Sequence, residues 1–132
     1  MAIEHIRLSK QAREQLVRLK RHTGVEHWNV LCRWAFCRSL AEPVTPAPSK
    51  IPADSNVEMS WKVFGGRHSE LYMALLKARC LRDGLSLDED TLAQQFRLHL
   101  HRGIAYVAND RELRSISALS GLASPRKLSP AT

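Results

Sequence analysis

The 132-residue sequence has no long apolar run and few aromatic residues. Because no stretch of about eighteen apolar residues occurs, no membrane-spanning helix is predicted. The N-terminal stretch MAIEHIRLSK lacks the apolar core of a signal peptide, so we expect a cytoplasmic protein. Aromatic residues make up only 6% of the chain, so Trp28, Trp34 and Trp61 are each expected to matter for packing. The remaining composition is that of one folded domain, expected over residues 1–120 with a disordered tail at 121–132.

Cysteines are few as well. The three, Cys32, Cys37 and Cys80, are an odd number and lack disulfide-framework or zinc spacing. Cys32 and Cys37 are five residues apart in a helical pattern and therefore point in different directions. The sequence predicts reduced and mostly buried thiols.

Recognisable catalytic constellations are also missing. No Ser-His-Asp set, nucleotide loop or carboxylate pair stands out by spacing. Gly65-Gly66 lacks the spacing and the lysine of a Walker loop, so a turn is the better interpretation. His99 and His101 would diverge by about 200° on a helix and could not share a metal ion. We therefore predict no catalytic residue, no cofactor and no bound metal.

The densest acidic stretch is Asp88-Glu89-Asp90. It could bind a divalent cation as nuclease sites do, but negative charge also stabilises a helix N-terminus. Capping is therefore the favoured role. A metal-dependent nicking enzyme using these acids or the histidines stays open as an alternative.

Positive charge is in excess and unevenly distributed. The formal net charge is +7 and the pI is about 9.8. Residues 1–42 carry eight Lys/Arg against four acids, residues 97–132 carry six against two, and residues 43–96 carry six against seven. A basic chain of this kind is a candidate for binding a polyanion. The alternative is a soluble protein that is merely basic.

Hydrophobic periodicity predicts a mainly α-helical, compact domain of about five helices with one or two short strands. Helices are expected over residues 10–22, 25–41, 68–83, 89–102 or beyond, and 110–120. Short strands are expected over residues 3–8 and 57–64. Between them, the stretch PVTPAPSKIP (43–52) contains four prolines and should form an extended connector.

The first helix separates its apolar and basic residues onto different faces. Ser9 is a good N-cap, and Gly24 suits a left-handed residue after the helix. A buried stripe is expected from Ala12, Leu16 and Leu19. Beside it, an arc of roughly 100° contains Lys10, Arg13, Lys20 and Arg21, and leaves Arg18 outside. We predict that this arc contacts DNA, and chance clustering on a Lys/Arg-rich helix is the alternative.

The second helix is much more apolar than a surface helix. Its broad apolar surface comes from Trp28, Leu31, Cys32, Ala35 and Phe36. Such a surface predicts a place in the core or at a subunit interface, with Arg33 and Arg38 reaching solvent, an acid or phosphate. The helix at 68–83 carries Leu71, Ala74, Leu75 and Ala78 on one side, and the next carries the stripe Leu92, Phe96 and Leu100.

The strand–helix–Gly–helix order of residues 5–41 is also the outline of a ribbon-helix-helix DNA reader. In that module a strand pair formed by a dimer enters the major groove, and His5 and Arg7 would be the reading side chains. Residues 57–64 offer another strand partner for residues 3–8. Both pairings stay open on the sequence alone.

Long peptides of this chain resemble the DndE family, the small subunits of bacterial DNA sulphur modification (phosphorothioation) systems. The resembling peptides are IEHIRLSKQAREQLVRLKRHTG, WNVLCRWAFCRSLAEP, IPADSNVEMSWKVFGG and FRLHLHRG. They span roughly residues 3–104, which is most of the expected domain.

The resemblance implies a DNA-binding component without an evident enzymatic activity. Its partners would be a cysteine desulfurase, an iron–sulphur protein and an ATPase-like subunit. It further implies a homotetramer that prefers nicked duplex DNA, contacted through lysines that correspond here to Lys10 and Lys20. Arg13 and Arg21, from helical geometry, and Arg7, from the strand, complete the predicted DNA-binding residues. A protein–protein adaptor of the modification complex is the remaining alternative.

Overall fold

The computed structural model describes residues 3–110. Within this range the chain forms five α-helices, one 3-10 turn and two short strands. In chain order these are β1 (His5–Arg7), α1 (Lys10–Thr23), α2 (Trp28–Leu40), β2 (Glu58–Ser60), α3 (Trp61–Gly65), η1 (Gly66–His68), α4 (Ser69–Arg82) and α5 (Glu89–Ala108). The predicted mainly α-helical class with one or two short strands is confirmed. The helix expected at 110–120 and the tail at 121–132 lie outside the described residues.

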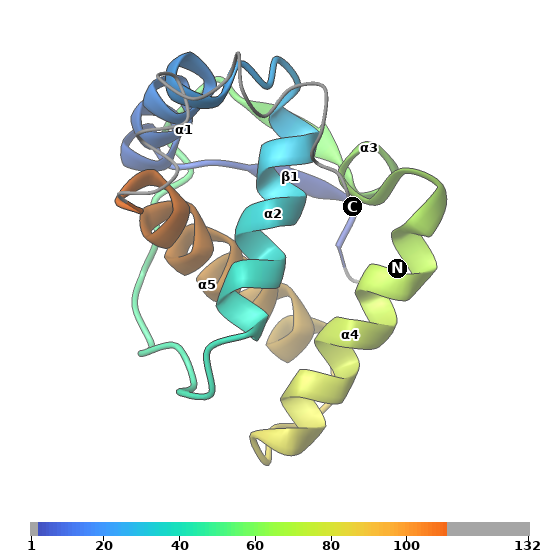
Figure 1. Cartoon of the computed structure of the whole chain (residues 1–132). Helices are drawn as coiled ribbons and strands as arrows, with labels where there is room; N and C mark the ends of the chain where they lie inside the picture. The colour runs from blue at the N-terminus through green and yellow to red at the C-terminus, as the bar shows by residue number, and fades with distance from the viewer. Residues whose placement is uncertain (1–2, 111–132) are drawn as a thin grey trace, which may run out of the picture.

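Helices α2 and α5 lie side by side through the middle of the molecule (Figure 1). Helix α1 packs on α5 at one end of this pair, and α3 and α4 pack on the other side. Ala35, Phe36, Phe96 and Leu100 are all buried between these helices. The apolar surface of α2 therefore serves the core of the chain itself. No helix in residues 3–110 is long and apolar enough to cross a membrane.

Aromatic rings fill the centre of this core. Phe36 contacts Phe64 edge-on, with ring centroids 5.8 Å apart, and lies 5.2 Å from Phe96. Trp61 packs against Phe96 at 5.1 Å, and Tyr72 reaches Phe64 at 5.5 Å. These rings come from four different helices, so their edge-to-face contacts tie α2, α3, α4 and α5 together. By contrast, Trp34 on α2 is 43% exposed.

The two strands pair with each other inside one chain. β1 runs antiparallel to β2, and Ile6 faces Met59 in the register. Ile6 is buried while His5 and Arg7 are exposed, as the alternating pattern predicts. Of the two pairings left open by the sequence, the structure therefore shows the one within the chain, in which β1 pairs with Glu58–Ser60. The outward His5 and Arg7 both contact Glu58.

The strand expected over residues 57–64 is shorter than predicted. It ends at Ser60, whose hydroxyl accepts a hydrogen bond from the Val63 amide at 3.1 Å and so caps helix α3. Alternation stops there: Trp61 is buried, but Val63 is 51% exposed. A capping serine within an alternating pattern thus converts the second half of the expected strand into a helical turn.

Helix α4 lies within one residue of the predicted bounds at each end but buries a different side. Its buried residues are Leu76, Arg79 and Cys80. The side predicted from periodicity is exposed in full, namely Leu71, Ala74, Leu75 and Ala78. With Leu81, which is 62% exposed, this side forms an apolar stripe on the surface of the described domain.

Candidate nucleic-acid interface

Helix α1 is fixed in place by its caps and its apolar stripe, as predicted. The Ser9 hydroxyl accepts a hydrogen bond from the Ala12 amide at 3.1 Å, and Gly24 ends the helix at φ 75°. The Asp54 carboxylate accepts the Lys10 amide at 2.7 Å, which satisfies a second donor of the first turn. The buried residues of the helix are Ala12, Leu16 and Leu19. The opposite half of α1 therefore faces outward.

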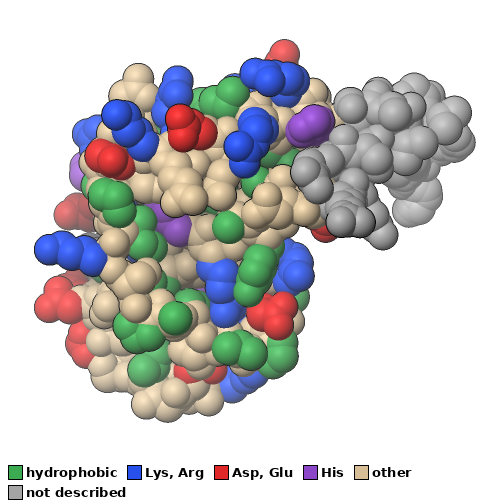
Figure 2. Space-filling model, turned by 90° about the vertical axis from the view of Figure 1, so that its left-hand side faces the viewer, with side chains coloured by type: hydrophobic (Ala, Val, Ile, Leu, Met, Phe, Trp, Pro, Cys, Tyr) green, Lys and Arg blue, Asp and Glu red, His purple; other side chains and the backbone are tan. Residues whose placement is uncertain are grey.

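The predicted basic arc lies on this outward half. Lys10 and Arg21 are exposed and Arg13 is half-buried, and no residue of the described chain forms an ion pair or hydrogen bond with their side chains. Lys20 differs, because its ammonium group lies 4.3 Å from the centroid of the Trp28 ring. Figure 2 shows Lys and Arg side chains gathered in the upper part of this face, where α1 lies.

Arg7, the fifth predicted DNA-binding residue, is placed apart from the arc. It forms an ion pair with Glu58 and donates a hydrogen bond to the Ser55 carbonyl at 2.9 Å. Its charge is therefore largely neutralised within the chain. The sequence brings Lys10, Arg13, Lys20 and Arg21 together on one helix, whereas Arg7 belongs to the sheet.

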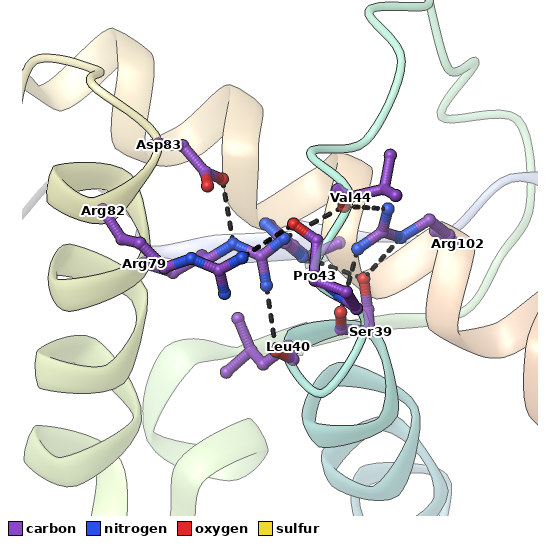
Figure 3. A network of polar contacts seen from close by, with 9 residues as sticks. Ser39, Leu40, Pro43, Val44, Arg79, Arg82, Asp83 and Arg102 are labelled. Atoms are coloured by element: carbon purple, nitrogen blue, oxygen red, sulfur yellow. Dashed lines mark hydrogen bonds and ion pairs between the residues drawn. The ribbon is translucent and has the colours of Figure 1, made fainter.

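Most arginines outside α1 bind backbone carbonyls inside the molecule (Figure 3). Arg79 donates to the carbonyls of Leu40 and Val44 at 2.9 and 3.0 Å, and pairs with Asp83 at 2.9 Å. Arg82 donates to the Pro43 carbonyl at 2.8 Å. These contacts hold the start of the proline-rich connector. Consequently the two arginines at the C-terminal end of α4 stabilise the fold.

Two arginines of α5 act in the same way. Arg97 donates to the carbonyls of Ile51 and Pro52 at 3.1 and 3.3 Å. Arg102 donates to the Val44 carbonyl and, through Nε at 2.9 Å, to the Ser39 hydroxyl. Burial lowers the pKa of both guanidinium groups from its usual value. The connector predicted at 43–52 thus contains neither helix nor strand, as expected, and is held by arginines of both α4 and α5.

The arginines of α2 are engaged as well. Arg33 was expected to reach solvent, an acid or phosphate, but its guanidinium group donates to the carbonyls of Phe64 and Val63. Arg38 pairs with Glu42 at 3.4 Å, which is the predicted acid contact. Eight Lys and Arg side chains in residues 3–110 form no hydrogen bond, ion pair or contact with an aromatic ring. Four of them lie on the single helix α1, namely Lys10, Arg13, Arg18 and Arg21. The other four are spread over the remaining chain, namely Lys50, Lys62, Arg67 and Lys77.

The two histidines of α5 are structural, as their helical divergence predicts. His99 is buried, and its Nδ1 lies 2.8 Å from the Ser39 hydroxyl. His101 donates from Nδ1 to the Arg97 carbonyl at 2.9 Å, and its Nε2 accepts the Ser9 amide at 3.2 Å. Burial is the main cause that lowers the pKa of each imidazole to about 4, so both rings are neutral at neutral pH. The two rings therefore cannot bind one metal ion together.

The acidic run caps α5 as predicted. One Asp88 oxygen accepts the Thr91 amide at 2.8 Å, and the other accepts the Thr91 and Ser86 hydroxyls. The Ser86 contact, followed by the Thr91 contacts, lowers the pKa of the Asp88 carboxyl. Across the described range no three His, Cys, Asp or Glu residues are grouped as metal ligands would be. Its observed role is helix capping.

A groove of about 700 Å³ opens beside the basic arc. Its walls are the first turns of α1, connector residues 46–54 and one side of α5. Sequence reasoning missed this groove, because it depends on how the connector crosses α5. Two signals did exist in the sequence, the exposed Lys50 and the extended proline-rich stretch that carries it.

Fold and site together define a small, mainly α-helical protein with a basic helix on its surface. The chain belongs to the DndE family, because the family model of DNA sulphur modification protein DndE matches residues 5–115. The resemblance of the sequence to the DndE family is thereby confirmed. The family's part in DNA phosphorothioation extends to this chain.

Solved structures agree with this family. The fold is similar to the crystal structure of DndE from Escherichia coli B7A, involved in DNA phosphorothioation modification, at a TM-score of 0.68 and 25% identity. It is also similar to a crystal structure of a DndE mutant involved in DNA phosphorothioation, at a TM-score of 0.63 and 24% identity. Each comparison covers 81% of this chain and 98% of the other. No curated protein sequence matches the chain at a significant level.

Proposed function

We propose that this protein is a DNA-binding accessory component of DNA phosphorothioation, which contacts the duplex backbone through the basic arc of α1. The supporting observation is the distribution of free cations. Arginines of α2, α4 and α5 are bound to carbonyls or acids, whereas Lys10, Arg13 and Arg21 project from one rigid helix without a partner in residues 3–110. Lysine and arginine on such a face neutralise phosphates and release condensed counterions.

The four arc residues have different parts in this proposal. Lys10 and Arg21 mark the two ends of the exposed helix, so they contact phosphates about 16 Å apart along its axis. Lys20 is held over Trp28, which fixes the direction of its ammonium group and reduces the entropy lost on binding. Arg7 contributes least because Glu58 already neutralises it.

Phosphate contacts of this kind position a protein on DNA and carry no sequence information. Binding is therefore indifferent to sequence. A nicked duplex bends more easily than an intact one, so a protein that engages phosphates from a curved surface prefers it. A homotetramer would repeat the arc four times along the DNA and raise the overall affinity.

An assembly of this protein has a suitable surface in α4. The exposed apolar stripe of α4 includes Leu71, Leu75 and Leu81, which are 54%, 38% and 62% exposed. It supports contact either with other copies or with the cysteine desulfurase, iron–sulphur and ATPase-like proteins of the modification system. The same stripe is the observation in favour of the second candidate function, a protein–protein adaptor.

The test is a binding titration by fluorescence anisotropy against nicked, intact and single-stranded DNA at several salt concentrations. The pair Lys10→Glu and Lys20→Glu should weaken binding and flatten the salt dependence, with the slope reduced by about 0.9 for each phosphate that is no longer neutralised. The pair Lys62→Glu and Lys77→Glu is the matched control, because it changes net charge equally at exposed sites away from α1.

Equal effects of the two pairs would show that net charge governs binding and would contradict the arc. A second comparison is made on the helix itself. Arg21→Glu should weaken binding more than Arg18→Glu, since only Arg21 lies in the arc. Equal affinity for nicked and intact duplexes would contradict the preference for nicks. Partner pull-downs that persist after nuclease treatment, with no DNA binding in the titration, would favour the adaptor.

A further inference from the structure

The groove beside α1 is a second candidate binding site on the same face. Its volume of about 700 Å³ is in the range of small-ligand sites and exceeds that of one nucleotide. The groove is therefore large enough to hold one nucleotide of a single strand. The groove is on the side of the molecule drawn in Figure 2, below the Lys and Arg side chains of α1.

Two lysines from opposite walls reach this groove. Lys10 comes from the first turn of α1 and Lys50 from the connector, and both side chains are exposed. Neither ammonium group has a hydrogen bond or ion pair within the described domain. Lys10 also belongs to the basic arc. A DNA strand that binds along α1 would therefore reach the groove with a phosphate close to Lys10 and Lys50.

The groove is lined by flat and apolar groups rather than by charge alone. Pro46, Pro52 and Leu98 are part of its lining, and so is the His101 ring. That ring is held from both nitrogens, by Ser9 and by the Arg97 carbonyl, and carries no charge at neutral pH. A rigid neutral imidazole in a lining that also contains proline rings is a surface on which a nucleobase can stack.

Uncharged polar side chains complete the lining. Gln11, Gln15 and Ser49 line the groove, and within residues 3–110 none of their side chains forms a hydrogen bond. Their amides and hydroxyl can donate to and accept from the edge of a base. Glu14 and Asp54 are also in the lining, beside the cations Lys10, Lys50 and Arg102, so the groove disfavours a ligand with several negative charges. A ligand with one phosphate and one base matches this combination of lysines, apolar rings and uncharged polar side chains.

We propose that the groove between α1, the connector and α5 binds a single unpaired nucleotide of a DNA strand. Its phosphate lies between Lys10 and Lys50, and its base stacks over the floor near His101. This inference rests on the proposed DNA binding and adds the ligand of a distinct site. It assigns phosphate binding to Lys50, whose side chain forms no hydrogen bond or ion pair within residues 3–110.

The experiment compares four labelled DNAs of one sequence with the full chain at fixed salt. They are an intact duplex, a nicked duplex, a nicked duplex with one unpaired nucleotide at the nick (the flap), and the same nicked duplex whose flap carries an abasic sugar. The unpaired nucleotide should tighten binding at least about 5-fold over the plain nick, because stacking contributes that much per base. The abasic flap should lose most of this gain.

Variants separate the groove from the arc. Lys50→Ala should abolish the gain from the unpaired nucleotide and leave binding to the intact duplex unchanged. Lys62→Ala, which removes an exposed lysine outside the groove, should preserve the gain. Ala105→Phe, which fills the groove from α5, should act like Lys50→Ala, with a melting curve to confirm folding.

Two results would overturn the inference. One is equal affinity for the plain nick and the flap, and the other is an equal loss from Lys50→Ala on all four DNAs. Either result leaves the proposed function standing if the duplexes still bind in a salt-dependent way. Failure to bind any of the four DNAs would instead reject the proposed function.

Discussion

Gly103 of α5 lies directly against the backbone of Ala35 in α2. A Cβ added at Gly103 would be 1.7 Å from the Ala35 carbonyl oxygen and 2.4 Å from the carbonyl carbon. Neither group is the end of a flexible side chain, so neither can move aside. The two central helices therefore approach as closely as they do because position 103 carries no side chain.

Gly103→Ala should consequently destabilise the fold, although alanine is the better helix former. A clash with backbone requires the helices to separate, so we expect a loss of about 3 kcal/mol in the free energy of unfolding. Chemical denaturation followed by circular dichroism measures it. Ala105→Ser on the same helix is the control and should change stability little. Wild-type stability in Gly103→Ala would contradict the close approach.

Arg79 is the most consequential arginine of the fold. Its side chain and that of its partner Asp83 are only 4% and 5% exposed. Arg79→Ala would leave a buried carboxylate unpaired and remove the Arg79 hydrogen bonds to the carbonyls of Leu40 and Val44, at a cost of about 3–5 kcal/mol. Thermal denaturation should show this loss. Arg82→Ala removes one exposed hydrogen bond, so an equally large effect there would contradict the assignment.

Stability should fall in mild acid because of the two α5 histidines. Burial lowers the pKa of His99 and His101 to about 4 in the folded chain, whereas the usual value is 6.5. Between these values the unfolded chain binds protons that the folded chain does not. The free energy of unfolding should therefore decrease as pH falls from about 6.5 toward about 4. Denaturant titrations at several pH values measure it.

His101→Gln should reduce this pH dependence, because an amide keeps hydrogen-bonding capacity without titrating. The exposed His27, changed to Gln, is the matched control. A free energy of unfolding that is flat over the same pH range would contradict the neutral state of both rings in the folded chain.

The cysteines should differ sharply in reactivity. Cys32 and Cys80 are buried, and burial raises the pKa of the Cys32 thiol to about 12. Cys37 is the exposed member of the three. Ellman's reagent should therefore titrate one thiol per folded chain, and all three after denaturation. Cys37→Ser should remove the reaction of the folded protein. Rapid reaction of three thiols in the folded state would contradict the packing.

The sequence predicted local structure well where the signals lie within one element. Ser9, Gly24 and the stripe of Ala12, Leu16 and Leu19 determine α1 without help from the remaining chain. The basic arc follows from the same helix, so its side chains could be grouped before the fold was known. Asp88 likewise caps α5 through its own first turn.

Prediction failed where a helix offers two apolar sides. On α4, Tyr72, Met73 and Leu76 fit a helical period as well as Leu71 and Leu75 do. Periodicity alone cannot choose between the two sides. The choice is made by distant rings, because Tyr72 packs against Phe36 and Phe64 from other helices. Which side a predominantly apolar helix buries is decided by its neighbours.

The arginine contacts could not be predicted for a different reason. Their acceptors are backbone carbonyls, which every residue has. Nothing in the sequence distinguishes the carbonyl of Val44 or Ile51 from any other. For the same reason the groove and the part proposed for Lys50 required the structure.

These contacts have a consequence for the proline-rich connector. Arg79, Arg82, Arg97 and Arg102 hold it entirely by atoms that do not depend on its side chains. The prolines of the connector restrict its backbone, and the arginines of α4 and α5 determine where it lies on the molecule. Substitutions at its exposed positions, such as Ser49 and Lys50, leave these contacts intact, so the chemistry of the groove wall can change without a change of fold.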